Sequence, residues 1–170
     1  DIIWHKPNPM PESVRDRCTK AHEYIFLLSK SKKYYYDNIA IKEPVKQDWG
    51  TRNRAAGKYH NAGTGLQPHS GLTKSYTTKN KRSVWSITNK PYKHAHFATF
   101  PPDLIEPCIL AGSKEGDIVL DPFMGSGTTA MVSKQHNRHF IGCELHEDYG
   151  ELIQNRMPPE ILAQDIENPL

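Results

Sequence analysis

Two glycines and a carboxylate near the C-terminal end of the chain have the spacing of a nucleotide-binding turn. Gly125 and Gly127 lie between a short apolar run, 117–121, and the start of a helix. Glycine has no Cβ, so it can take turn conformations and let a ligand lie against the main chain. The N–H groups that open the following helix are unpaired within it and point toward such a ligand. Glu144 ends the next apolar run, 17 residues after Gly127. In dinucleotide-binding folds an acidic residue about 20 positions after the glycines binds the ribose hydroxyls.

The glycine pattern by itself leaves other nucleotide sites open. With Ala130 in the third place it also fits the nicotinamide fingerprint. A nicotinamide enzyme is disfavoured because two βα units at the end of the chain leave no second nucleotide-binding half. A phosphate-binding P-loop is disfavoured because no lysine follows the glycines.

The wider sequence around the glycines resembles a known family. Asp121-Pro-Phe-x-Gly-Ser-Gly-Thr-Thr is preceded by His96-Phe-Ala-Thr-Phe-Pro101 and followed by Ile141-Gly-Cys-Glu144. This series resembles the amino-group DNA methyltransferases that use S-adenosylmethionine, in the subgroup whose cofactor motif lies C-terminal to the catalytic motif. The resemblance extends through Asn80–Trp85 and back to Ile2–Pro11. It implies site-specific methyl transfer to adenine N6 or cytosine N4 of duplex DNA, with adenine preferred by overall likeness.

The resemblance also implies roles for individual residues. Those that match the cofactor loop, the ribose carboxylate and the segment against the methionine part are Phe97, Ala98, Thr99, Phe100, Asp121, Pro122, Phe123, Gly125, Ser126, Gly127, Thr128 and Glu144. Those that match the loop beside the flipped base, or supply cations and donors in the target-recognition region, are Trp4, Lys6, Asn8, Arg52, Arg54, Lys79, Lys81 and Arg82. For each of these cations we expect a contact with a DNA phosphate rather than with a base edge.

One part of the family pattern is absent from the 170 residues. The catalytic tetrapeptide has the form Asp/Asn/Ser-Pro-Pro-Tyr/Trp/Phe, and the nearest match, Phe100-Pro-Pro-Asp103, lacks both the polar first residue and the aromatic last one. The family places this tetrapeptide before the segment that begins at Ile2, so we assign no catalytic residue. The alternative to an enzyme is therefore a catalytically inactive remnant that binds DNA, cofactor or both.

Charge is divided unevenly along the chain. Residues 1–94 hold 18 Lys and Arg against 7 Asp and Glu, a net of +11, and residues 95–170 hold 4 against 12, a net of −8. A basic half is typical of a protein that binds a phosphate backbone, so the expected partner is double-stranded DNA.

Composition narrows the cellular setting. An odd number of cysteines, three, without a Cys-x-x-Cys spacing favours a reducing cytoplasm. The family resemblance implies a bacterial or phage-encoded protein. Because no apolar run approaches 18 residues, no membrane is expected. Paired histidines at 94 and 96 and at 136 and 139 have no completing ligands, so no metal is expected.

The predicted fold is α/β, a partial Rossmann-like methyltransferase sheet with an irregular basic insertion. Proline and glycine positions, apolar runs and helix stop signals predict strands over 1–4, 23–28, 34–36, 84–87, 117–121 and 139–144, and helices over 101–111, 127–135 and 147–157. Residues 13–20 are expected to be a short helix or an ordered loop, and Gly112 a C-cap. The expected parts are 1–43 on the catalytic side, 44–93 for target recognition and 94–170 for the cofactor. An unpaired sheet edge makes a homodimer possible.

Overall fold

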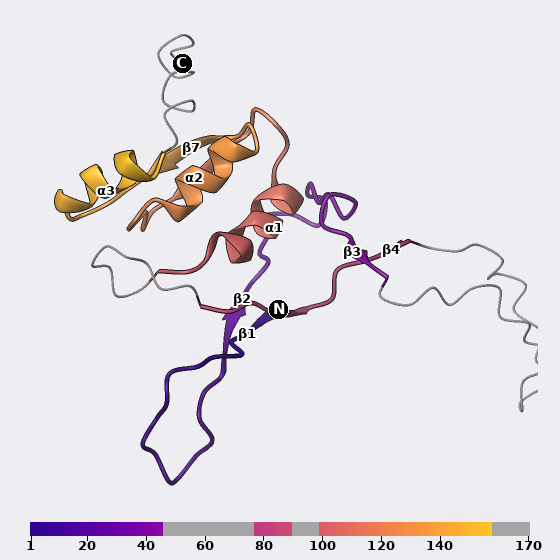
Figure 1. Ribbon diagram of the computed structural model, residues 1–170. Helices are drawn as coiled ribbons and strands as arrows, with labels where there is room; N and C mark the ends of the chain where they lie inside the picture. Colours follow the sequence, from indigo (N-terminus) through magenta and orange to yellow (C-terminus); the bar gives the residue numbers. More distant parts are fainter. Residues whose placement is uncertain (46–76, 90–98, 158–170) are drawn as a thin grey trace, which may run out of the picture. The chain divides into compact units, whose positions relative to one another are not determined.

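The computed structural model describes residues 1–45, 77–89 and 99–157. The chain folds as two units: Asp1–Ile41 together with Arg82–Leu170, and Lys42–Lys81 between them in the sequence. The segment after Arg82 belongs to the first unit, because it pairs with the N-terminal strand. Figure 1 shows the order of the elements along the chain.

The N-terminal strand is the centre of a three-stranded sheet. The strand β1 (Ile2–His5) pairs antiparallel with β2 (His22–Ile25) and parallel with β5 (Val84–Ser86). The parallel register sets Trp4 opposite Trp85, and both indoles are 5% exposed. These two rings and Leu104 form a hydrophobic core, and the Trp4 indole donates its N–H to the carbonyl of Ile87 at 2.8 Å. The predicted strands at 1–4 and 84–87 are confirmed within a residue or two.

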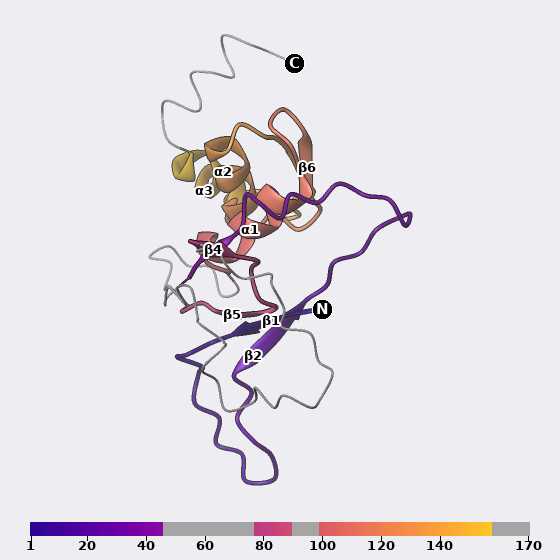
Figure 2. The same ribbon diagram turned by 90° about the vertical axis from the view of Figure 1, so that its right-hand side faces the viewer.

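A second, parallel pair of strands carries the glycine turn. The strand β6 (Ile118–Asp121) runs into the turn, the helix α2 (Thr128–Gln135) follows, and the chain returns as β7 (His139–Gly142), in register with β6. Figures 1 and 2 show α2 against this pair of strands. Ala130 and Val132 of α2 are almost fully buried there, whereas Ile118, Leu120 and Ile141 of the strands are more than half exposed.

Two further helices flank α2. The helix α1 (Pro102–Gly112) starts with proline in its first turn, where a missing N–H costs nothing, and packs against α2. It ends one residue later than predicted: Gly112 is its last residue, and Ser113 in extended conformation is the C-cap. The helix α3 (Asp148–Arg156) follows β7. The three predicted helices are thus confirmed. Within the ranges described, no helix has the length and apolar character that crossing a lipid bilayer requires.

The second unit begins and ends with a short antiparallel pair. The strand β3 (Glu43–Pro44) pairs with β4 (Thr78–Lys79), and the N–H of Val45 donates to the carbonyl of Thr77 at 2.9 Å. This pair was not predicted, because two residues are too few to show an alternating pattern.

Two predicted strands are wrong in part or in whole. The strand predicted over 23–28 ends at Ile25, which lies opposite Ile2, so that only Asp1 remains to pair beyond it. The side chains of Phe26, Leu27 and Leu28 are 66%, 52% and 86% exposed. No strand forms over 34–36, where all three tyrosines are exposed, and 13–20 contains no helix.

Candidate functional site

The glycine turn has the backbone that its sequence predicts. Gly125 has φ 54° and Gly127 has φ 78°, both in the left-handed region that favours glycine. Gly127 is the N-cap of α2, donating its N–H to the carbonyl of Met124 at 3.0 Å and accepting from Met131 at 3.0 Å. A Cβ placed on Gly127 would lie 3.1 Å from the Ile153 side chain of α3. The turn is therefore held from behind by α3 and has no room for a side chain at this position.

Asp121 fixes both ends of the turn. One carboxylate oxygen accepts from the N–H of Phe123 at 2.9 Å, and the other accepts from the Thr129 hydroxyl at 2.6 Å. The carboxylate thus ties the end of β6 to the first turn of α2. Thr129 was not among the predicted residues, and its place directly after Thr128 in the motif was the available signal. Ser126 and Thr128 are buried, whereas Pro122 and Phe123 lie on the exposed side of the turn.

Glu144 closes onto the glycine turn from the end of the neighbouring strand. One of its carboxylate oxygens accepts from the N–H of Gly125 at 2.7 Å. The other accepts from the N–H groups of Leu145 and His146, each at 2.9 Å. These bonds, that of His146 foremost, hold the pKa of Glu144 below its ordinary value against the opposing effect of desolvation. The carboxylate is therefore charged at neutral pH and oriented toward the turn.

The lowered pKa of Glu144 predicts how the turn responds to acid. A carboxyl group with a depressed folded-state pKa keeps its bonds at and above its ordinary value and loses them as the pH falls through the folded-state pKa. The amide resonance of Gly125 in a ¹⁵N-resolved titration is therefore expected to change with a midpoint below the ordinary range of glutamate. A midpoint inside that ordinary range would mean that the bonds do not form in solution.

The helix α3 supports the turn through a second contact. The guanidinium of Arg156 donates to the hydroxyl of Ser126 at 2.7 Å and lies 3.4 Å from its carbonyl oxygen. Ser126 is 4% exposed, so its hydroxyl depends on protein partners. The sequence did not reveal this contact, because an arginine in the last turn of a helix is also common for its favourable interaction with the helix dipole.

Arg156→Met is expected to lower the free energy of unfolding by about 1–3 kcal/mol, because it leaves the buried Ser126 hydroxyl without this donor. Urea unfolding followed by circular dichroism measures the change. Arg17→Met is the matched control: Arg17 pairs with Glu12 at 3.3 Å, but its side chain is 61% exposed. The control is expected to cost less than about 1 kcal/mol. Equal losses in the two variants would contradict the contact between α3 and the turn.

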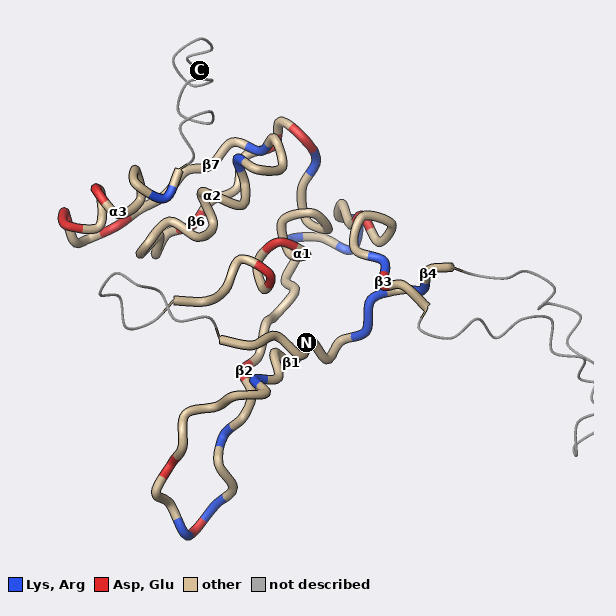
Figure 3. Tube along the Cα trace, viewed as in Figure 1, with Lys and Arg blue, Asp and Glu red and all other residues tan. Residues whose placement is uncertain are grey.

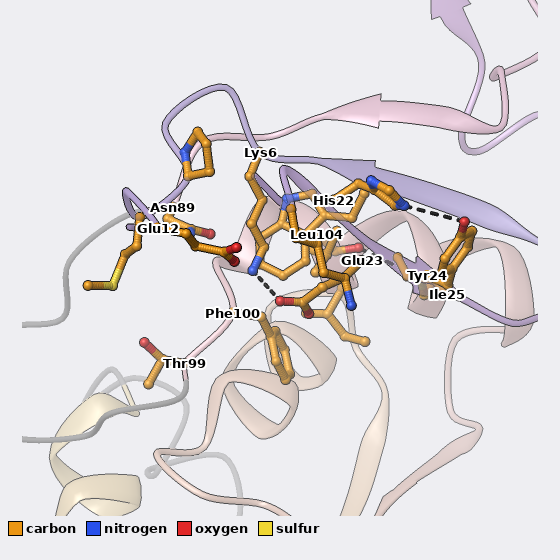
Figure 4. A pocket seen from close by; sticks show the side chains of 16 residues that line it. Lys6, Glu12, His22, Glu23, Tyr24, Ile25, Asn89, Thr99, Phe100 and Leu104 are labelled. Atoms are coloured by element: carbon orange, nitrogen blue, oxygen red, sulfur yellow. Dashed lines mark hydrogen bonds and ion pairs between the residues drawn. The ribbon is translucent and has the colours of Figure 1, made fainter. Parts of the chain in front are cut away.

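A cavity of about 730 Å³ lies beside the three-stranded sheet. Figure 4 shows its lining, which includes Lys6, Glu23, Thr99 and Phe100. Trp4 also lines it, although its ring belongs to the core. The structure therefore brings together residues that the sequence assigned to two tasks, the base-side Trp4 and Lys6 and the cofactor-side Thr99 and Phe100.

The residues predicted for the base side are held in place by neighbours. The ammonium of Lys6 lies 4.3 Å from the centre of the Trp4 ring and forms an ion pair with Glu23. Asn8 uses its side-chain amide to bind the backbone of Asn89, accepting from the N–H at 3.2 Å and donating to the carbonyl at 3.4 Å. The N-terminal segment and the segment after β5 are thus joined beyond the end of the sheet.

Several predicted DNA-binding cations lie where the second unit begins and ends. Figure 3 shows basic residues around β3 and β4. Of the predicted cations, Lys79 lies in β4 and Lys81 and Arg82 follow it; Lys42, directly before β3, was not predicted. Lys79 lies 3.8 Å from the Glu43 carboxylate across the pair of strands. Arg52 and Arg54, and Phe97 and Ala98 on the cofactor side, lie outside the described residues. In the described part of the chain no three His, Cys, Asp or Glu side chains gather as a metal site.

Comparisons with known proteins extend over most of the chain. It is 46% identical over 160 residues to the type II methyltransferase M.Cfr9I of Citrobacter freundii, which covers 94% of this chain and 44% of that protein. The crystal structure of the M1.HpyAVI–SAM complex matches with a TM-score of 0.56 and 26% identity, over 92% of this chain and 60% of that one. The PvuII DNA methyltransferase (cytosine-N4-specific) matches with a TM-score of 0.63 and 18% identity, over 95% of this chain and 54% of that one.

These matches establish the fold as that of the methyltransferases, an α/β Rossmann-like architecture. The chain spans less than half the length of M.Cfr9I and of two further curated relatives that it matches, M.SmaI of Serratia marcescens and M.XycI of Xanthomonas campestris pv. cyanopsidis. A family model described as DNA methylase matches residues 1–155, which include the glycine turn, its carboxylate Glu144 and the N-terminal sheet. The chain therefore belongs to the DNA methylase family.

Proposed function

We propose that this chain forms the cofactor-binding and DNA-recognition part of a site-specific DNA methyltransferase. The enzyme would transfer a methyl group from S-adenosylmethionine to the exocyclic amine of adenine (N6) or cytosine (N4), as a restriction-modification or solitary methylase. The observation that carries the proposal is the glycine turn with positive φ at Gly125 and Gly127, tied at its start by Asp121 and closed by Glu144.

The residues of the turn fit the proposed cofactor. Gly125 and Gly127 keep the main chain open to a flat ligand, and Glu144 presents a charged acceptor of the kind that binds ribose hydroxyls. When bound, S-adenosylmethionine supplies an electrophilic methyl group. This chain would hold the adenosine against the turn with Asp121, Ser126 and the N-terminal end of α2. Thr99 and Phe100 would lie along its methionine part.

The cavity beside β1 fits the base side of the reaction. Enzymes that modify a base inside a duplex rotate it out of the stack into a closely fitting pocket. The cavity of about 730 Å³ has room for a nucleobase, and its walls combine Trp4 and Phe100 with the Lys6–Glu23 pair. The Trp4 and Lys6 side chains would position the base, and a wall of apolar carbon would keep bulk water away from the amine.

DNA would be bound through the basic half of the chain. Lys79 and Lys81 lie at the end of the second unit and Arg82 follows it directly. Contacts from Lys and Arg to phosphates make DNA binding strongly dependent on salt. A homodimer through unpaired sheet edges and a cytoplasmic setting belong to the same proposal. They rest on the short parallel pair β6–β7 and on three cysteines that are all free in the structure.

The test is methyl transfer by the purified full-length protein. Tritiated S-adenosylmethionine is mixed with unmethylated bulk DNA, and the digested product is separated into nucleosides. Label recovered in N6-methyldeoxyadenosine or in N4-methyldeoxycytidine would support methyltransferase activity and would identify the methylated base. Cofactor binding without transfer would favour the inactive remnant. If the protein showed neither cofactor binding nor methyl transfer, the proposal would be overturned.

A further inference from the structure

We propose that the segment from Lys30 to Tyr36 is a DNA-contact surface, which binds phosphates of the duplex from outside the target-recognition region. This inference rests on the proposed function. None of these residues is among the DNA-binding residues predicted from the sequence, which predicted a strand over 34–36. Three observations carry the inference: the exposure of the segment, the bonds that hold its two ends, and its single sign of charge.

The segment combines cations with aromatic side chains, and all of them are exposed. The side chains of Tyr34–Tyr36 are 54%, 41% and 45% exposed, and the three lysines within Lys30–Lys33 are exposed as well. Water solvates an ammonium group well, but an exposed aromatic ring keeps its apolar surface in water. Contiguous exposed apolar surface with polar groups beside it is typical of an interaction site. The run of tyrosines therefore indicates a surface with a partner.

Bonds within the chain hold both ends of the segment. The Ser29 hydroxyl donates to the carbonyl of Ser31 at 2.8 Å, and the Ser31 hydroxyl donates to the carbonyl of Lys33 at 2.5 Å. At the other end, the N–H of Asp37 donates to the carbonyl of Ala111 in α1 at 2.9 Å. Figure 2 shows the purple trace leaving β2, turning, and returning past α1. A surface whose ends are fixed in this way loses less freedom when it binds.

The charge of the segment has one sign. Between Tyr24 and Tyr36 the chain has three lysines and no Asp or Glu, and in the described part of the chain none of these lysines forms an ion pair. Figure 3 shows basic residues on the trace between β2 and β3. Lys114 adds an ammonium group 5.1 Å from the centre of the Tyr35 ring. The carboxylate of Asp37, which follows the tyrosines, accepts from two backbone N–H groups at 2.9 and 3.1 Å. The three lysines are therefore open to an anion.

This combination fits a nucleic acid better than a protein. Lysine is depleted in protein–protein interfaces, whereas protein–DNA interfaces are more polar and much more positively charged. Ammonium groups of lysine and hydroxyl groups of tyrosine both donate to phosphate oxygens, and such contacts position a duplex without reading its sequence. The three lysines supply charge to the phosphates, and the hydroxyls of Tyr34 and Tyr36 supply hydrogen bonds.

Replacement of the three lysines together by glutamine tests the surface. Each lost phosphate contact lowers the slope of log affinity against log salt concentration by about 0.9, so we expect the slope to fall by about 2–3. Fluorescence anisotropy of a labelled duplex, titrated with the full-length protein at several KCl concentrations, measures the slope. The matched variant with arginine at the same three positions keeps the charge and should keep the slope. The Tm should not change in either variant, because the replaced side chains are exposed.

Tyr34→Phe and Tyr36→Phe each remove a hydroxyl and no charge. We expect each to weaken DNA binding roughly two- to tenfold without changing the salt slope. Lys134→Gln is the control for the loss of a positive charge elsewhere: Lys134 belongs to α2 and lies 5.9 Å from the centre of the Phe140 ring. It should change neither the affinity for DNA nor the slope.

An unchanged salt slope in the glutamine variant, with DNA bound by the unsubstituted protein, would overturn this inference and leave the proposed function standing. An equal loss of slope in the arginine variant, or a fall in Tm that accounts for weaker binding, would also overturn it, by giving the lysines a structural role. A change from dimer to monomer in sedimentation, with the slope unchanged, would overturn it by assigning the surface to a second copy of the chain. If the unsubstituted protein bound no duplex DNA, the DNA-binding part of the proposed function would fail, and this inference with it.

Discussion

A Gly127→Val protein is expected to lose about 1–3 kcal/mol of stability from backbone strain alone, because position 127 has φ 78° and valine is β-branched. The new side chain would also meet Ile153, where even a single Cβ lies at 3.1 Å. Relief of that contact requires the turn or α3 to move, and the turn carries the Gly125 N–H that donates to Glu144. S-adenosylhomocysteine affinity is therefore expected to fall at least about tenfold. Urea unfolding and titration calorimetry measure the two effects.

Gly112→Ala is the matched control for this substitution. Gly112 ends α1 without a positive φ, and a Cβ there meets nothing within 4 Å. Alanine is the better helix former, so stability should stay the same or rise by up to about 1 kcal/mol. Cofactor affinity should not change. If Gly127→Val behaved like Gly112→Ala, the turn would not be held in the conformation described.

Glu144→Gln is expected to reduce cofactor affinity by roughly ten- to a hundredfold. An amide has one acceptor oxygen where the carboxylate has two. If that oxygen keeps the bonds to Leu145 and His146, the amide nitrogen faces the N–H of Gly125 at the place of a 2.7 Å bond. Two donors then oppose each other at the turn, and the charged acceptor for a ribose is lost as well. Calorimetry with S-adenosylhomocysteine measures the affinity.

Glu147→Gln serves as the control for the loss of one negative charge near the turn. Glu147 is exposed, three residues further along the chain, and no bond of its carboxylate to the turn is present. The affinity of the Glu147→Gln protein for S-adenosylhomocysteine should equal that of the unsubstituted protein. Equal losses in the two variants would assign the effect to overall charge, and would refute the specific role of Glu144.

The sequence predicted the glycine turn and its elements because the information is local. Gly125, Gly127 and the apolar runs before and after them lie within a stretch whose farthest cited bond, Gly125 to Glu144, spans 19 positions. Strand, turn, helix and returning strand then follow from composition and stop signals. The charged acceptor at the end of β7 was also predictable, because its spacing from the glycines is a property of the βαβ unit.

The wrong predictions concern segments that form a strand only where a partner strand lies beside them. Phe26–Leu28 and Tyr34–Tyr36 have the apolar and aromatic residues of strands, yet the first lies past the end of its partner strand and the second has none. β-propensity describes how well a side chain fits a half-buried pleated surface, and does not supply that surface. Composition alone could not have distinguished these exposed runs from a buried strand.

The contacts around the proposed base-side residues could be predicted only in part. Trp4, Lys6 and Asn8 were expected on resemblance, but their partners Glu23 and Asn89 were not. Asn8 and Asn89 are 81 positions apart, and the bond between them depends on the parallel register of β1 and β5. The packing of the two tryptophans sets this register. The sequence pattern of either strand by itself does not reveal it.

The separation of β1 and β5 along the chain also sets an order in time. A ribosome adds about 5–20 residues per second, so roughly 4–16 s pass between the synthesis of Asn8 and that of the residue it binds, 81 positions later. During that interval the first strand has β2 as its neighbour, and the wall of the cavity that Asn89 forms does not yet exist. The glycine turn and Glu144, only 19 positions apart, emerge within about 1–4 s of each other. During synthesis the glycine turn therefore forms as a local event, whereas the cavity wall beside β1 must wait for distant parts of the chain to meet.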